Sequence, residues 1–316
     1  MRSVCSQPKL IISVYGGRKY FTMSEDIEKE FMDSMAEAAI TSGTWIITSG
    51  LNNGAAKLIG EGVARLRALV YKKRDVTLVG MAWWGNIAEK ARTMVLQLQR
   101  KYSRTNSRET ILTNTKVPFR FDDKDTHALE RNHTHFLLLD DGKYRSQDKR
   151  EESSSSEQQA EFMKIINYPK EMQRSDFVTH ACEIEKCYSV TIVIEGGINP
   201  CLAILNDIQY KRPVVFVQGS GKLADVIASL IELTANNEYT PARKPERHEI
   251  EHNLKRFRMR AKTEQERQQQ IDQIEKIMDP EKQDDAEKKT NNSKQSGANY
   301  DDDVIDSEQR SPANQE

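Results

Sequence analysis

The sequence predicts an α/β fold, a Rossmann-like parallel sheet with helices on both faces, followed by a charged helical and disordered C-terminal tail. Three observations predict it. Six short apolar runs alternate with helical patterns, which favours a parallel sheet covered on both faces. Glycine or acidic turns follow those runs. The composition of the 316 residues, 37% hydrophobic and 30% charged, is lean for a chain that folds throughout.

The predicted strands are continuous runs rich in Ile, Val and Leu, as expected for strands buried on both faces. They are residues 10–14, 45–48, 76–79, 135–139, 190–194 and 214–217. The turns after them are residues 15–17, 49–54, 80–85, 140–142, 195–197 and 218–221. After the first strand, Ser24 precedes acidic residues and apolar positions at three- and four-residue steps, which predicts an N-cap and a helix that ends at Gly43. A second helix is expected to begin near Ala55.

Composition also predicts where the folded domain ends. We expect an N-terminal tail (1–8), a folded α/β domain (9–235), a charged helical extension (236–279) and a disordered tail (280–316). The last segment has almost no apolar residues, so it cannot bury enough surface to offset its chain entropy. Residues 142–160 are of low complexity and are expected to form a flexible insertion; residues 100–133 also exceed the usual loop length.

Charge and composition exclude several classes of protein. Lys and Arg number 47 against 48 Asp and Glu, so no overall field attracts nucleic acid or a membrane surface. No run approaches the roughly 18 apolar residues that a spanning helix needs, and the N-terminus lacks a signal-peptide pattern. Four cysteines in a chain of this length indicate reduced thiols rather than a disulfide scaffold. We therefore expect a cytoplasmic chain with no nucleic-acid partner and no membrane-spanning segment.

The glycine turns indicate a ligand site, because the carboxyl ends of parallel strands meet at one edge of a sheet, where ligands bind. Glycine lets a ligand approach the main chain, and the first N–H groups of a following helix favour an anion. Two turns fit this description: Asn53-Gly54 with Lys57, and Ser220-Gly221 with Lys222. A single turn of this kind is also explained by a tight connection between a strand and a helix, with no ligand. Neither the G-x-G-x-x-G fingerprint nor a P-loop occurs, which excludes ordinary NAD dehydrogenases and P-loop NTPases.

The turns occur in a recognisable order along the chain. The motifs are ISVYGG (12–17), AITSGTWIITSG (39–50), Asn53-Gly54 with Ile59-Gly60, GMAWWG (80–85), NHTHF (132–136) with DDG (140–142), EGG (195–197) and GSGKLAD (219–225). Over residues 9–232 this series resembles the N-terminal SLOG domain of TRPM cation channels. The resemblance implies a nucleotide-sensing domain in the cytosolic part of a calcium-permeable channel. Its implied partners are the rest of such a channel or other subunits, and in some members the ligand is ADP-ribose or a related nucleotide.

The same resemblance implies contact residues. Matched by motif, the positions that contact the nucleotide in ligand-binding members are Asn53, Lys57, Tyr144 and Lys222. Three of the four depart from the family: Asn replaces Thr, and Lys replaces Arg twice. Lysine is a point charge whereas arginine is a planar two-pronged donor, so we expect weaker and less oriented phosphate contacts. The arginine-containing helix that follows Gly-Lys-Tyr in the family is replaced by the serine-rich stretch.

Hydrolases of the wider SLOG superfamily carry the motif Pro-Gly-Gly-x-Gly-Thr-x-x-Glu, in which the glutamate supports cleavage. The corresponding stretch here is EGGINPCLA (195–203), with Ala203 in place of that glutamate and Pro200 in place of the threonine. Proline lacks both the hydroxyl and a backbone donor. The sequence therefore predicts binding without turnover and no catalytic residue. Glu195 is either a substitute acid or a cap for nearby N–H groups.

The other candidate reactive residues are interpreted as having ordinary structural roles. His133 and His135 lie beside Asp140 and Asp141 without a third and fourth metal ligand at a recognisable spacing. His180, Cys182 and Cys187 are likewise read as an ordinary cluster, so no metal is expected. Cys201 is either a thiol activated by a helix start or, as we prefer, a small packed residue. The basic stretch 255–260 has acidic neighbours and is expected to be a solvated helix.

The prediction is a non-catalytic, cytosolic nucleotide-sensing domain, with no cofactor beyond an ADP-ribose-like ligand. The alternatives are a nucleotide-processing hydrolase of the same fold and a ligand-free domain for subunit assembly. The expected ligand contacts are Gly16, Gly17, Asn53, Gly54, Lys57, Tyr144, Glu195, Gly197, Ser220, Gly221 and Lys222.

Overall fold

The computed structural model describes residues 7–17, 23–41, 43–69, 76–103, 125–140, 170–235 and 243–279. The predicted ligand contact Tyr144, the insertion 142–160 and the tail 280–316 lie outside these residues.

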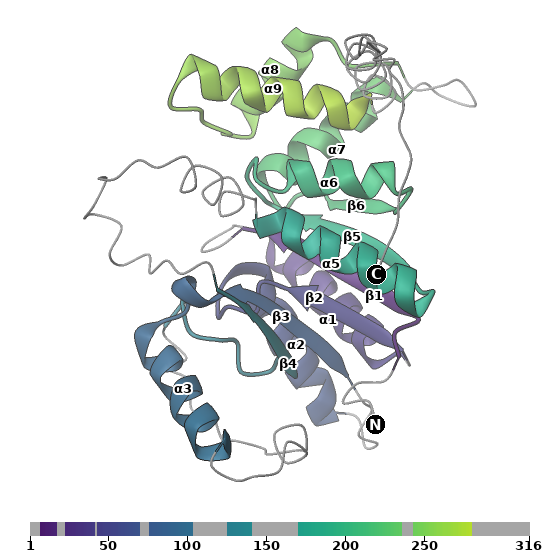
Figure 1. The fold of residues 1–316 in the computed structure, drawn as a ribbon. Coiled ribbons are helices and arrows are strands. Elements are labelled where there is room, and N and C mark those ends of the chain that lie inside the picture. The colour runs from purple at the N-terminus through teal and green to yellow at the C-terminus, as the bar shows by residue number, and fades with distance from the viewer. Residues whose placement is uncertain are drawn as a thin grey trace, which may run out of the picture.

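A parallel sheet forms the centre of the molecule (Figure 1), as the apolar runs predict. Its six strands are β1 (Leu10–Gly16), β2 (Thr44–Thr48), β3 (Thr77–Trp83), β4 (His135–Leu139), β5 (Tyr188–Ile194) and β6 (Val214–Val217). The strand order is β4-β3-β2-β1-β5-β6, and every neighbouring pair is parallel. The chain thus winds outward from β1 in one direction and from β5 in the other, so the switch in winding lies between these two strands.

Helices cover both faces of the sheet, as predicted. The described helices are α1 (Glu25–Ile40), α2 (Gly54–Leu69), the 3-10 turn η1 (Trp84–Asn86), α3 (Glu89–Ser103), α5 (Lys170–Glu185), α6 (Cys201–Gln209), α7 (Lys222–Thr234), α8 (Arg247–Arg256) and α9 (Glu264–Met278). Helices α1 and α2 pack on the face that carries Ile12 and Ile46, whereas α5 packs on the opposite face with Ile11 and Ile47. The predicted N-cap is confirmed, since the Ser24 hydroxyl accepts a hydrogen bond from Ile27 N.

Strand β3 corrects one prediction. The sequence indicated a strand that stops before a turn at Gly80, but β3 continues through Gly80 to Trp83. The glycine has a different purpose here: a Cβ atom on Gly80 would lie 2.6 Å from the Cα atom of Gly50 in the turn after β2. Gly80 therefore allows two adjacent main-chain segments to approach closely without interrupting its own strand.

The C-terminal helices α8 and α9 pack against α6 and α7 at the β6 end of the sheet (Figure 1). Ile250 of α8 and Ile271 and Ile274 of α9 are almost fully buried in one apolar cluster that also contains Leu223 of α7. The segment 236–279, expected to be a charged helical extension, thus buries apolar residues of α8, while Arg247, Lys255 and Arg256 of the same helix are exposed. Among the described helices, none combines the length and apolar character that crossing a bilayer requires.

Candidate functional site

The carboxyl ends of β1, β2, β3 and β4 enclose a cavity of about 580 Å³, a volume typical of small-molecule sites. The strands contribute Val14, Gly16, Thr48, Met81, Ala82, Trp83 and Leu139 to its lining. Ala55 and Ala56 of the first turn of α2 also line it, and the N–H groups of a first turn have no acceptor within their own helix. The site therefore lies at the edge of the sheet that the glycine turns predicted.

Arg174, which α5 presents to this cavity, is nine-tenths buried and tightly oriented. Its Nη1 donates to the carbonyl oxygen of Val14 at 2.8 Å, and its guanidinium carbon lies 3.9 Å from the centre of the Tyr15 ring. Burial raises the pKa of Tyr15 above its ordinary value, so the ring beneath the cation is a neutral phenol. Stacking on an aromatic face leaves the planar guanidinium edge as the group that can meet a ligand.

Arg92, in the first turns of α3, supplies a second guanidinium to the cavity lining. Its Nη1 donates to the carbonyl oxygen of Ile87 at 3.0 Å, which ties α3 to the turn after β3. Carboxylates line the same cavity: Glu89 opens α3, and Asp125 Oδ1 accepts a hydrogen bond from the main-chain N–H of His127 at 2.9 Å. The lining thus offers cations that suit phosphate and acceptors that suit hydroxyl groups.

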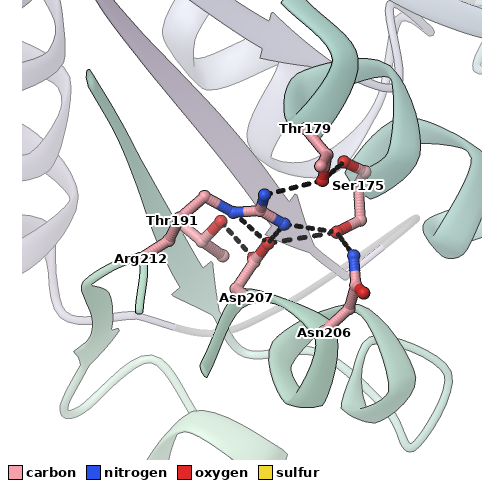
Figure 2. Close-up of polar contacts among 6 residues, drawn as sticks. All are labelled: Ser175, Thr179, Thr191, Asn206, Asp207 and Arg212. Carbon is pink, nitrogen blue, oxygen red and sulfur yellow. Dashed lines mark hydrogen bonds and ion pairs between the residues drawn. The ribbon is translucent and has the colours of Figure 1, made fainter. Parts of the chain in front are cut away.

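A buried polar network fixes α5, the helix that carries Arg174 (Figure 2). Asp207 of α6 is 1% exposed and forms an ion pair with Arg212. Ser175, the neighbour of Arg174, donates to Asp207 Oδ1 at 3.0 Å, and Arg212 Nη1 donates to Thr179 Oγ1 at 2.6 Å. Thr191 of β5 and Asn206 of α6 complete the network. One helix (α6), one strand (β5) and Arg212, in the turn between α6 and β6, therefore hold α5 in one position.

The structure brings part of the predicted site to the cavity. Gly16, Gly17 and Asn53 line it, and Asn53 Nδ2 donates to the carbonyl oxygen of Thr126 at 2.5 Å. Gly54 begins α2 with a φ of 51°, in the left-handed region that favours glycine. Lys57 is not among the lining residues; its side chain is 43% exposed and its Nζ lies 3.8 Å from Glu61 Oε1.

The remaining predicted residues lie at the ends of β5 and β6 and do not line the cavity: Glu195, Gly197, Ser220, Gly221 and Lys222. Lys222 Nζ lies 2.7 Å from Glu195 Oε1. The N–H groups of Leu223 and Ala224 in α7 donate to the carbonyl oxygens of Gly196 and Glu195 at 3.3 and 3.0 Å. The second predicted anion site is therefore occupied by the chain's own groups.

The stretch that corresponds to the hydrolase motif is packed. Pro200 is the N-cap of α6, and Ala203 and Cys201 are fully buried. Burial raises the pKa of the Cys201 thiol to about 12, which confirms a small packed residue rather than an activated thiol.

His133 belongs to a buried chain of hydrogen bonds. Its Nε2 lies 2.7 Å from Thr48 Oγ1 and its Nδ1 lies 2.7 Å from Glu130 Oε2. Within the described part of the chain, no group of three or more His, Cys, Asp or Glu side chains is arranged to hold a metal ion. Asp141, the fourth residue of that constellation, lies outside the described residues.

Sequence reasoning missed the two cavity arginines, Arg92 and Arg174. Neither lies in a glycine turn, yet both lie in the first two turns of a helix that connects parallel strands. Such a helix runs back along the sheet, so it begins at the carboxyl edge. Scanning the starts of connecting helices for arginine could have found both residues.

Comparison with known proteins identifies the family to which this chain is similar. Residues 3–278 match the family described as SLOG in TRPM. The chain is 31% identical over 223 residues to transient receptor potential cation channel subfamily M member-like 2 of Nematostella vectensis, covering 70% of this chain and 13% of that protein. It is 29% identical over 225 residues to subfamily M member 6 of Mus musculus, covering 70% of this chain and 10% of that protein. With subfamily M member 2 of Rattus norvegicus it shares 28% over 238 residues, 72% of this chain and 14% of that protein. The matches thus span only about a seventh or less of the length of these relatives.

Proposed function

Because the chain belongs to the family of SLOG domains of TRPM channels, we propose that it is a non-catalytic nucleotide-sensing domain whose ligand is ADP-ribose or a related nucleotide. In this proposal, such a domain forms the cytoplasmic part of a calcium-permeable cation channel or assembles with other subunits. A ligand in the cavity changes the state of that channel or of those subunits.

One observation carries the proposal: the cavity of about 580 Å³ joins the first turn of α2 to Arg92 and Arg174. A diphosphate meets helix N–H groups on one side and guanidinium groups on the other, and each hydrogen bond to a charged group contributes about 1.5–3 kcal/mol. Acceptors such as Asp125 suit ribose hydroxyls, and the apolar lining, which includes Leu51 and Ile87, suits the base.

We propose that the domain does not turn over its nucleotide because the stretch that corresponds to the hydrolase motif, residues 195–203, lacks the reactive groups. Ala203 offers no carboxylate, Pro200 offers no hydroxyl, and the thiol of Cys201 is buried with a pKa raised to about 12. General acid–base catalysis needs a positioned group with a pKa near the working pH. None of these three side chains supplies one.

The test is to incubate the purified chain with ADP-ribose and a panel of nucleotides, and to follow thermal unfolding and nucleotide integrity. A ligand at a hundredfold its dissociation constant stabilises a fold by about 2.7 kcal/mol, which gives a clear melting shift. We expect that shift with ADP-ribose recovered unchanged on chromatography. We also expect Arg174→Ala to weaken binding tenfold or more, because one charged hydrogen bond is worth at least that factor.

The matched control is Arg67→Ala, which removes an exposed arginine from the last turn of α2, the end away from the cavity. It should leave ADP-ribose affinity unchanged. A new nucleotide product would identify a hydrolase instead. No melting shift with any nucleotide would overturn the sensor and favour a domain that serves only subunit assembly.

A further inference from the structure

The ends of β1 and β5 form the switch point of the sheet, where doubly wound sheets leave a crevice for ligands. The register pairs Gly16 with Ile194, so Gly17 and Glu195 are the first residues beyond the paired strands on the two sides. What occupies this crevice is the side chain of Glu195. A Cβ atom on Gly17 would overlap its carboxylate, so the carboxylate lies directly against the main chain of β1's turn.

Three contacts hold Glu195 there. The Lys222 ammonium lies 2.7 Å from Oε1, the main-chain N–H of Glu195 donates to Ser220 Oγ at 2.8 Å, and its carbonyl oxygen accepts from Ala224 N at 3.0 Å. The Glu195 side chain is only 6% exposed, whereas Lys222 is 49% exposed. The carboxylate is thus enclosed, and the ammonium that would otherwise attract a ligand anion is already paired.

The backbone at both partners is unusual. Glu195 has a φ of 54° and Lys222 a φ of 44°, both in the left-handed region that side chains other than glycine rarely adopt. Residues held in this region cluster at ligand sites and switch regions, where the surrounding structure overrides the strain. Lys186, Lys211 and Arg258 also have a positive φ, but Glu195 and Lys222 are the two such residues that form an ion pair with each other, at the ends of β5 and β6.

These observations lead to a statement about ligand selection. We propose that Glu195 is a specificity-determining residue of the nucleotide site: its carboxylate takes the place of a ligand anion beside Lys222. Phosphate groups are thereby excluded from the α7 end of the edge and directed to the cavity lined by Arg92 and Arg174. The physical reason is that the Glu195 carboxylate already neutralises the Lys222 ammonium, and it repels a second anion that approaches the same cation. This inference rests on the proposed function for the identity of the ligand, but its own test uses inorganic pyrophosphate.

The test compares the full chain with Glu195→Gln, which keeps the size of the side chain and removes its charge. We expect the variant to bind inorganic pyrophosphate at least tenfold more tightly than the wild type by isothermal titration calorimetry at low salt. We expect Lys222→Ala in the Glu195→Gln background to abolish that gain, because the released ammonium is the new anion site. Glu183→Gln, an exposed α5 carboxylate near the opposite edge of the sheet, is the control for net charge and should bind as the wild type does.

A second measurement needs no variant. In the wild type, saturating ADP-ribose should leave the acetylation rate of Lys222 unchanged by mass spectrometry, with exposed Lys255 as the internal reference. Protection of Lys222 would overturn the inference while leaving nucleotide sensing intact. So would an unchanged pyrophosphate affinity in a folded Glu195→Gln variant, or a gain that survives the loss of Lys222. If no nucleotide binds but Glu195→Gln gains pyrophosphate, the proposed function fails and the role of Glu195 stands.

Discussion

At the scale of single residues, burial decides which chemistry a side chain can perform, and Cys201 shows this. It begins α6 directly after the turn that ends β5, a position where an exposed cysteine would be activated. Instead it is fully buried, and its thiol pKa is raised to about 12. At pH 8 only about one thiol in 10⁴ is ionised at such a pKa, against roughly a quarter for an ordinary cysteine.

We therefore expect iodoacetamide at pH 8 to leave Cys201 unmodified in the native protein and to modify it fully in urea. As the pH rises, alkylation of Cys201 should begin only when the pH approaches the pKa of its thiol or when the protein unfolds. Peptide mass spectrometry measures this, and Cys182, which is only partly buried, is the internal comparison. Native labelling of Cys201 at the rate of Cys182 would mean that the thiol is accessible and would reopen the possibility of a nucleophile.

At the scale of helices and strands, buried charge fixes the position of α5. Asp207→Ala would leave Arg212, whose side chain is 8% exposed, buried without its carboxylate. Breaking a buried pair by removing one partner typically costs about 3–5 kcal/mol, so we expect a loss of that size in the free energy of unfolding from urea titration. Because Ser175 of the same network adjoins Arg174, ADP-ribose affinity should fall as well.

The double variant Asp207→Leu with Arg212→Met is the control, because replacing a buried pair by apolar residues of similar volume is often neutral. It should recover most of the stability. Equal losses in the single and double variants would show that packing, rather than the unpaired charge, sets the cost.

Elements of this kind differ in how far the sequence predicts them. Strands such as 190–194 could be located because a sheet buried on both faces demands unbroken apolar runs. Gly17 and Asn53 could be assigned to the site because strand ends share an edge. The pairing of Glu195 with Lys222 could not, because it requires the strand order and the direction of each side chain. Arg174 lies in no motif, and its only signal is its place near the start of a helix that connects two parallel strands.

At the scale of the whole molecule, the question is whether the C-terminal helices α8 and α9 belong to the same folded domain as the sheet. Composition placed the boundary at residue 235, because the charged residues of 236–279 outnumber the apolar ones. The apolar residues that remain recur at three- and four-residue steps, and Ile250, Leu254, Ile271 and Ile274 share one cluster with α6 and α7. Periodicity, rather than average composition, carries the information about packing.

Ile274→Ala tests whether α9 belongs to the same cooperative unit as the sheet. Ile274 is fully buried, and truncating a buried isoleucine to alanine costs about 2–5 kcal/mol, so we expect a loss of that size with one unfolding transition. Ile231→Ala in α7, 47% exposed, is the matched control and should cost well under half as much. Circular dichroism during urea titration and a calorimetric scan measure both variants. If Ile274→Ala instead separates an early transition of α8 and α9 from an unchanged main one, the helices are an appendage and the domain ends before them.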